Sequence, residues 1–346
     1  IYLAIAADPD TTTPTVENSF DVVTYTGNGG TQSIETDFKP DLVWVKSRNH
    51  ANNHFLYDSI RGVSKAIYIQ AETEITRSGV TSFDTNGFTL GSSNDMNLNN
   101  NTFVAWCWKA GDHDDNLPQI NTEGTIDSIV SVNDAAGFSI VKHIGNGILA
   151  TIGHGLSSAP ELIIYKQTSS SAVGKNWVVY ASPLGNTKGL ILNLSYSAFT
   201  DADAWNNTTP TSTVFSVGAG DDAYGTQTNV SGKENIAYCF TSIAGYQKIG
   251  TYNGGSSGSS NVITTGFKPR FLLVKRTDAA GDAWQMFDSI RGGGDTFDNY
   301  VQANSSAAET SYSLREVNFS NDGFYWTNAE SGTNISGGTY IYLAIK

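Results

Sequence analysis

Internal repetition constrains the fold of this chain more than any other feature of its sequence. Nearly the same string begins the chain, IYLAIAA at 1–7, and ends it, YIYLAIK at 340–346. A strand-like segment also recurs three times, as FKPDLVWVK at 38–46, APELIIYK at 159–166 and FKPRFLLVK at 267–275. The prolines of these segments are separated by 120 and then by 109 residues. The chain therefore uses one unit of about a hundred residues three times, which is far longer than a solenoid repeat.

Further landmarks keep the same order in each copy. Two motifs recur in the first and third copies, namely YDSIRG at 57–62 with FDSIRG at 287–292, and DTNGFTLG at 84–91 with NDGFYW at 321–326. Glycine turns precede the proline segments, at 27–30, 145–147 and 253–255. Each copy closes on an aromatic strand-like segment, at 103–111, 236–245 and 340–346. The middle copy is divergent, but it keeps the turn and the closing segment.

The local sequence is typical of β-structure throughout. Short runs rich in β-branched and aromatic residues, such as 41–46, 142–149 and 190–194, alternate with clusters of Gly, Asn, Ser and Asp. No segment has apolar residues at helical spacing over three turns. Each copy is long enough to bury a core of its own, so we expect an all-β chain of three β-sandwich domains in series, each with about seven or eight strands.

The repeat boundaries predict a division of the chain into six parts. The parts are a closing strand of a preceding repeat (1–7), a linker (8–20), repeat one (21–111), a second linker (112–127), the divergent repeat two (128–245) and repeat three (246–346). The opening string aligns with the closing segments, so we expect the chain to be the C-terminal part of a longer protein.

Composition argues against two classes of partner. Twenty Lys and Arg against 33 Asp and Glu give a net charge of −13, whereas binding to nucleic acid requires clustered basic residues. No apolar run approaches the length of about 18 residues that a membrane span needs, so we expect no membrane insertion. The low charged fraction of 15% is common in extracellular and virion surface proteins.

The two cysteines align with each other in the closing segments. Cys107 and Cys239 occupy one aligned position, where the third copy is aligned with Leu343 and the opening string with Leu3. Apolar replacement indicates a buried position, where a free cysteine behaves as a small hydrophobic residue. We therefore expect both thiols to be reduced and structural.

The DSIRG motif is the most tempting candidate for chemistry. Asp58 with Arg61, and Asp288 with Arg291, could grip a ligand or could form ion pairs that close a corner between a strand and a turn. The middle copy reads YASPLG at 180–185 and carries neither charge. We interpret both pairs as structural.

Candidate metal ligands do not form a convincing set. His50 and His54 are spaced by four residues, but the intervening Asn-Asn favours a solvated loop over a helix, and no third ligand follows at a suitable spacing. Acidic clusters at 112–115, 201–203 and 221–222 lack the spacing of a calcium loop. We predict no cofactor and no metal site, although loop composition leaves a structural calcium ion open.

The Gly-x-Ser-x-Gly string at 254–258 lies in a predicted Gly/Ser turn and does not resemble a nucleophile elbow. The carboxylates lie mostly in turns of varied sequence, so we expect no enzyme. Aromatic residues in polar segments are the usual platforms for stacking on sugars. Trp205, Tyr224 and Trp284 fit that description and are the candidate glycan-binding residues.

Taken together, FKPDLVWVK, YDSIRG, TSFDTNGFTLG and FVAWCWKAG resemble a repeated domain of unknown function from tail-fibre-like and other structural proteins of marine bacteriophages, especially cyanophages. The resemblance covers the first and third copies and is weak in the middle copy. It implies a sandwich similar to jelly-roll and concanavalin A-like lectin domains, located at a virion surface. It brings no known catalytic residues.

Three functional hypotheses follow from the sequence and the resemblance. The leading one is a non-enzymatic virion protein (a tail fibre, appendage or capsid decoration) that attaches to a host surface glycan or protein. Its partners would be other virion proteins and further copies of itself, as in a trimer. The alternative is an array of carbohydrate-binding modules in a secreted or surface protein, and the third is a polysaccharide depolymerase.

Overall fold

The protein is built from β-strands that pair antiparallel. A computed structural model describes residues 18–70, 74–111, 119–169, 176–201, 203–218, 228–255, 257–292 and 294–346. Across these residues the chain contains no α-helix, and its helical turns are the short 3-10 segments η2 (Ser182–Leu184) and η3 (Ser313–Arg315). The all-β prediction is therefore confirmed, and the strands form three groups.

Each group has one large sheet, which we call the inner sheet. In spatial order, that of repeat 1 (20–108) contains β1 (Phe20–Thr26), β9 (Thr102–Trp108), β3 (Leu42–Ser47), β4 (Phe55–Asp58), β5 (Lys65–Tyr68) and β6 (Glu74–Thr76). That of repeat 2 (119–240) contains β10 (Gln119–Asn121), β11 (Ser128–Asn133), β12 (Phe138–Ile144), β19 (Glu234–Phe240), β14 (Leu162–Gln167), β15 (Val178–Ala181), β16 (Lys188–Ile191) and β17 (Phe199–Thr200). That of repeat 3 (247–345) contains β20 (Gln247–Asn253), β29 (Thr339–Ile345), β22 (Phe271–Arg276), β23 (Gln285–Asp288), β25 (Asn299–Gln302) and β26 (Thr310–Ser311).

A smaller outer sheet covers one face of each inner sheet. It consists of β2 (Gln32–Glu35), β8 (Gly87–Leu90) and β7 (Val80–Asp84) in repeat 1, and of β13 (Ala150–Gly153) and β18 (Val214–Val217) in repeat 2. In repeat 3 it consists of β21 (Ile263–Thr264), β28 (Gly323–Trp326), β27 (Val317–Ser320) and β24 (Thr296–Phe297). Each repeat thus has a sandwich-like core of its own between its two sheets.

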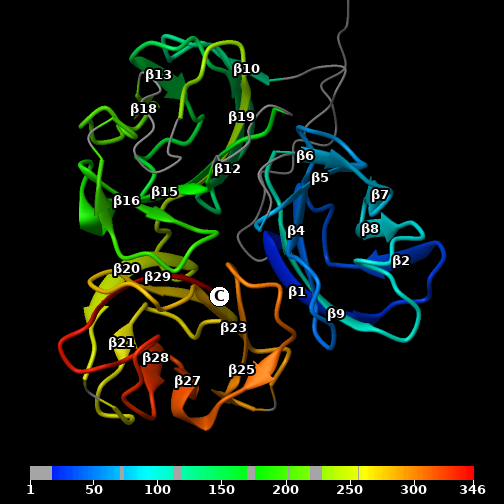
Figure 1. Cartoon of the computed structure of the whole chain (residues 1–346), viewed down its shortest axis with the longest axis vertical. Helices are drawn as coiled ribbons and strands as arrows, with labels where there is room; N and C mark the ends of the chain where they lie inside the picture. The colour runs from blue at the N-terminus through cyan, green and yellow to red at the C-terminus, as the bar shows by residue number, and fades with distance from the viewer. Residues whose placement is uncertain are drawn as a thin grey trace, which may run out of the picture.

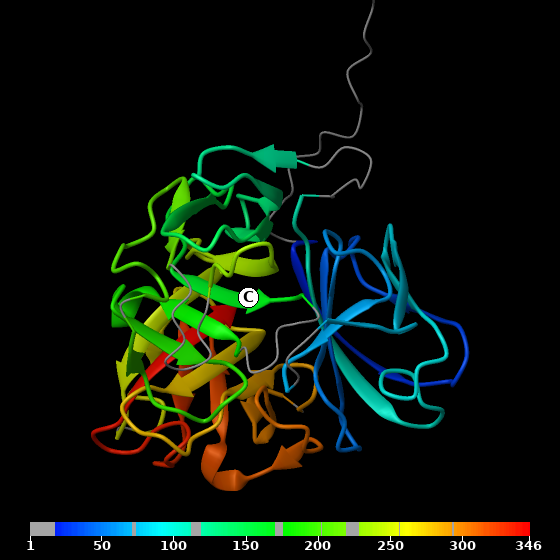
Figure 2. The same cartoon turned by 45° about the horizontal axis from the view of Figure 1, so that its top comes forward.

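The three repeats share an apolar core in addition to their own cores. The largest apolar cluster of the molecule, here called the central core, takes side chains from all three inner sheets, including Trp106, Tyr238 and Leu343. Figure 1 shows the three repeats as lobes around a common centre, where the C-terminus lies, and the tilted view of Figure 2 shows them again in contact. The repeats pack on one another because the free face of every inner sheet is apolar and must be covered.

The closing strands explain why these faces meet. In β9, Val104, Trp106 and Trp108 face the central core, while the alternate residues Phe103 and Cys107 face the core of repeat 1. All these side chains are at most 3% exposed. A strand that is apolar at every position must be buried on both faces, so one face packs on the outer sheet and the other on the neighbouring repeats.

Strand register corrects the alignment of the third closing strand. Cys107 is opposite Val43, Cys239 is opposite Ile163, and the equivalent partner pair in repeat 3 is Leu272 with Ala344. The residue equivalent to the cysteines is therefore Ala344 and not Leu343, which faces the central core. The predicted chemistry of the cysteines is nevertheless confirmed, because both are free and buried.

Backbone hydrogen bonds join the repeats into a closed ring. The amide of Glu74 in repeat 1 donates to the carbonyl of Thr168 in repeat 2 (3.2 Å), and that of Ala198 in repeat 2 donates to Thr277 in repeat 3 (2.8 Å). The ring closes where Glu309 of repeat 3 donates to Arg48 of repeat 1 (2.8 Å). The three contacts use equivalent positions and run in one direction, as in a cyclic trimer assembled from a single chain.

Candidate functional site

The two DSIRG motifs form buried ion pairs at equivalent corners of the inner sheets. Nε of Arg61 lies 2.5 Å from Oδ2 of Asp58, and Nε of Arg291 lies 2.6 Å from Oδ2 of Asp288. The backbone amide of each arginine also donates to Oδ1 of its aspartate. We call these the Asp–Arg corners. Both carboxylates are almost fully buried, and these donors offset the cost of removing them from water.

A glutamate completes each Asp–Arg corner. Nη1 of Arg61 lies 3.2 Å from Glu74, and Nη1 of Arg291 lies 3.1 Å from Glu309. Burial lowers the pKa of Arg61, but the charges of Asp58 and Glu74 and the hydrogen bond to Asp58 outweigh burial and raise it above its usual value. The guanidinium therefore stays charged and holds two acidic groups together.

Each Asp–Arg corner also accepts a donor from a different repeat. The phenol of Tyr238 in repeat 2 donates to Asp58 (2.8 Å), and the indole Nε1 of Trp106 in repeat 1 donates to Asp288 (3.1 Å). The guanidinium of Arg291 lies over the Trp106 ring, 5.3 Å from its centroid. Burial and the charge of Asp58 raise the pKa of Tyr238 well above 10, so its hydroxyl remains a donor. The DSIRG motifs thus lie at contacts between repeats.

His54 lies at one of these contacts and not in a solvated loop, so that part of the sequence interpretation is wrong. Its Nδ1 accepts from Trp44 Nε1 (2.9 Å), which leaves Nε2 to donate to the Gln302 carbonyl of repeat 3 (3.0 Å). Burial, with the charges of Lys46 and Arg291, lowers the pKa of His54 well below 6.5. The ring is therefore a neutral bridge between repeats 1 and 3. His50 is exposed.

The lysine that ends each proline segment is buried. Lys46 donates to the carbonyls of Ser47 (2.8 Å) and His50 (3.3 Å) and, across the repeat boundary, to that of Ser306 (3.2 Å). Burial lowers the pKa of Lys46 to about 8, with Arg291 adding to this effect and Glu309 opposing it. Its counterpart Lys275 also has its pKa lowered to about 8, mainly by burial.

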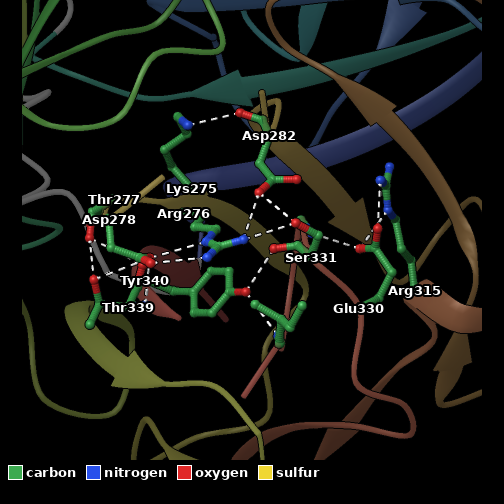
Figure 3. Close-up of polar contacts among 12 residues, drawn as sticks. Lys275, Arg276, Thr277, Asp278, Asp282, Arg315, Glu330, Ser331, Thr339 and Tyr340 are labelled. Atoms are coloured by element: carbon green, nitrogen blue, oxygen red, sulfur yellow. Dashed lines mark hydrogen bonds and ion pairs between the residues drawn. The ribbon is translucent and has the colours of Figure 1, made fainter. Parts of the chain in front are cut away.

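Repeat 3 carries a further polar network, drawn in Figure 3. The guanidinium of Arg276 contacts Asp278 (3.0 Å) and Asp282 (3.2 Å), and its Nη1 donates to Ser331 (2.9 Å). Hydrogen bonding to Arg276 lowers the pKa of Asp278 to about 2. The Tyr340 phenol donates to the Ser331 carbonyl (2.7 Å). These contacts fasten two loops to the ends of β22 and β29, which is a structural task.

A set of buried asparagines was missed by the sequence analysis. Asn97, Asn229 and Asn334 each brace the glycine turn of their own repeat, and their carbonyls accept from Gly29, Gly147 and Gly255. Nδ2 of Asn97 donates to the carbonyls of Gly30 (2.6 Å) and Gly91 (3.1 Å). A signal was available, because each asparagine lies six residues before the second residue of its closing strand, at Phe103, Asn235 and Tyr340.

The candidate glycan-binding tryptophans are not exposed. Trp205 and Trp284 are each 1% exposed, the first in the core of repeat 2 and the second in the central core. Trp284 Nε1 donates to the Ile191 carbonyl of repeat 2 (2.9 Å). Exposure was expected because both lie in polar segments, but their rings are covered by neighbouring elements and have no free face for stacking on a sugar. Tyr224 lies outside the described residues.

One hollow of about 830 Å³ lies at the outer sheet of repeat 1. Its lining includes Glu35, Asp37 and Asp84, together with hydroxyl and amide side chains. Asp84 already accepts from Ser82 (2.7 Å) and Thr89 (2.6 Å). The hollow is polar and acidic, so it could accept a ligand rich in hydrogen-bond donors.

Other expected features are reported for the described part of the chain alone. No group of three or more His, Cys, Asp or Glu side chains with metal-binding geometry occurs there. The acidic clusters at 112–115 and 221–222 lie outside it. No helix in the same part of the chain is long and apolar enough to cross a membrane.

Comparison with protein families places this chain in a family. The profile described as "Domain of unknown function (DUF7483)" matches residues 16–346. The chain belongs to this family. The match spans all three repeats. None of the curated proteins matches the chain.

Proposed function

We propose that the protein is a non-enzymatic structural component of a virion, as a tail fibre, appendage or capsid decoration, that displays its loops to a host surface. The observation that carries the proposal is that the buried charged side chains bind other groups of the protein. Asp58, Arg61, Asp288, Arg291 and Lys46 all contact groups of a neighbouring repeat or of their own corner. Active sites instead keep a charged or basic group available to a substrate.

The family resemblance from the sequence supports the virion setting, and the ring supports display. Each repeat, with its two layers of strands, fits a jelly-roll or concanavalin A-like sandwich, and three such units around one core give a stable platform whose loops face outward. The proposed location is the virion surface, and the proposed partners are other virion proteins and a host glycan or protein. Self-association is tested by light scattering, where a trimer would have three times the 37.0 kDa of one chain.

The decisive experiment combines localisation with binding. Antibody raised against the protein should label intact particles in electron microscopy, and the purified, fluorescently labelled protein should bind host cells and not unrelated cells. Absence of label on particles would contradict the virion role. Release of reducing sugar from host polysaccharide would instead support the depolymerase hypothesis.

The alternative, a carbohydrate-binding array, is favoured by the polar hollow of repeat 1. Repeat 3 offers a matched comparison, because Glu35 pairs with Gly87 where the equivalent Thr264 pairs with Gly323. A glycan array should give hits that are lost in a Glu35→Thr, Asp37→Ala variant with unchanged melting temperature. An array without hits would leave attachment to a host protein as the binding mode.

A further inference from the structure

The Asp–Arg corners have a counterpart in repeat 2 that explains why the motif is missing there. Asp58, Ala181 and Asp288 are equivalent, because each pairs with the first residue of the neighbouring strand, at Leu42, Leu162 and Phe271. Three residues later, the arginine position is occupied by Leu184 in repeat 2. The glutamate position, defined by the ring of backbone contacts, is occupied by Ala198. Repeat 2 thus replaces a complete charged set, Asp, Arg and Glu, with apolar residues.

The donor positions on the closing strands are equivalent as well. Trp106, Tyr238 and Leu343 each pair with the third residue of the same neighbouring strand, at Trp44, Ile164 and Leu273. All three face the central core. Two of them can donate a hydrogen bond and the third cannot.

Donors and acceptors match around the ring. The corner of repeat 1 receives Tyr238 from repeat 2, and the corner of repeat 3 receives Trp106 from repeat 1. The same direction of contact places the closing strand of repeat 3, with Leu343, toward the corner of repeat 2. There the corner offers Ala181 and Leu184, which both pack on the central core with Leu343. A charged corner therefore occurs where its neighbour supplies a donor, and an apolar corner occurs where its neighbour does not.

We propose that the aspartate position of each corner and the donor position of each closing strand form a recognition code between repeats. The code determines which neighbour each repeat accepts in the ring. The surface is the corner of one repeat, and its partner is the closing strand of another repeat with matching chemistry. The one other cyclic order of three repeats would place Leu343 against Asp58, leaving a buried carboxylate without one of its donors. It would also place Trp106 against Ala181, leaving a buried indole without an acceptor. Both outcomes are unfavourable in a dry core, so the code acts mainly by excluding wrong pairings.

The test transplants the charged corner into repeat 2 of the full chain. The variant Ala181→Asp, Leu184→Arg, Ala198→Glu should melt at least about 5 °C lower, because the new carboxylate faces Leu343. Adding Leu343→Tyr should recover a clear part of that loss by supplying the phenol. Adding Leu343→Phe is the matched control, since it has nearly the same size and no hydroxyl, and it should recover less. Equal melting temperatures for the Tyr and Phe additions would overturn the proposal.

A second cycle keeps the proposal testable if the transplanted corner prevents folding. Tyr238→Phe removes only the hydroxyl that Asp58 accepts from, and it should lower the melting temperature of the native chain. In a background with the apolar corner of repeat 2, Asp58→Ala, Arg61→Leu and Glu74→Ala, the same substitution should have little or no effect. An equal loss in both backgrounds would mean that the phenol does not recognise the corner.

Discussion

At the scale of single residues, the most informative groups are ionisable side chains that the fold holds neutral. His143 is 2% exposed, and its Nε2 lies 2.8 Å from the phenol oxygen of Tyr165, which itself donates to the Thr228 carbonyl. The imidazole therefore donates through Nε2. Burial lowers the pKa of His143 to about 4. No local sequence pattern indicates this burial, because a histidine in a strand has the same neighbours in sequence whether or not its face is covered.

The buried histidine makes stability depend on pH. Between pH 6.5 and about 4 the unfolded state binds a proton on His143 that the folded state refuses, so the free energy of unfolding falls as the solution is acidified. The loss from this group approaches about 3 kcal/mol over the interval. Urea titrations at several pH values measure how the free energy of unfolding changes with pH. This change should be smaller for His143→Gln than for the parent. A variant of the exposed His50 should show the same change as the parent.

The two cysteines give a second prediction at this scale. Burial raises the pKa of both thiols, and the charge of Asp21 raises that of Cys107 further. Each side chain is 0% exposed, in the core of a different repeat. The native protein should not react with a thiol reagent within minutes. In denaturant, each chain should react with two equivalents of the reagent. A bridge between Cys107 and Cys239 in non-reducing mass spectrometry would contradict the structure.

At the scale of elements, the sequence predicted which strands form better than which elements cover them. Strands around FKPDLVWVK and FVAWCWKAG are present because their β-branched and aromatic residues favour extended chain and their flanking turns stop it. The uninterrupted apolar run of β9 also contained the information that both faces are buried. What it could not specify was the covering partner, since an outer sheet and a neighbouring repeat are equally apolar.

The glycine turns and their asparagines act as one element in each repeat. Asn97→Ala should lower the free energy of unfolding by about 2–4 kcal/mol, because it leaves the carbonyls of Gly30 and Gly91 and the amide of Asn28 without their partner. The matched control is the exposed Asn99, two residues along the same loop, whose replacement by alanine should change stability by less than about 0.5 kcal/mol. Chemical denaturation measures both values. Similar losses for the two variants would show that Asn97 does not brace the turn.

At the scale of the whole molecule, neighbouring repeats bury charged and aromatic residues whose local sequences indicate exposure. Trp284 lies in a polar segment and still reaches the central core, because a neighbouring repeat covers its loop. Asp58 lies at a turn and still is buried, because Tyr238 of another repeat packs on it. Such long-range cover is set by the ring, and a single sequence does not contain it in any local pattern.

The shared core makes a prediction for unfolding as a whole. Three independent sandwiches would melt in up to three steps, whereas repeats that lose the cover of a common apolar face together should melt in one. Calorimetry should therefore give a single transition with equal calorimetric and van't Hoff enthalpies. Hydrogen exchange should show the three closing strands, Thr102–Trp108, Glu234–Phe240 and Thr339–Ile345, opening at a common free energy. Separate transitions, or one closing strand that exchanges well before the others, would mean that the repeats keep their cores individually and that the ring adds little to their stability.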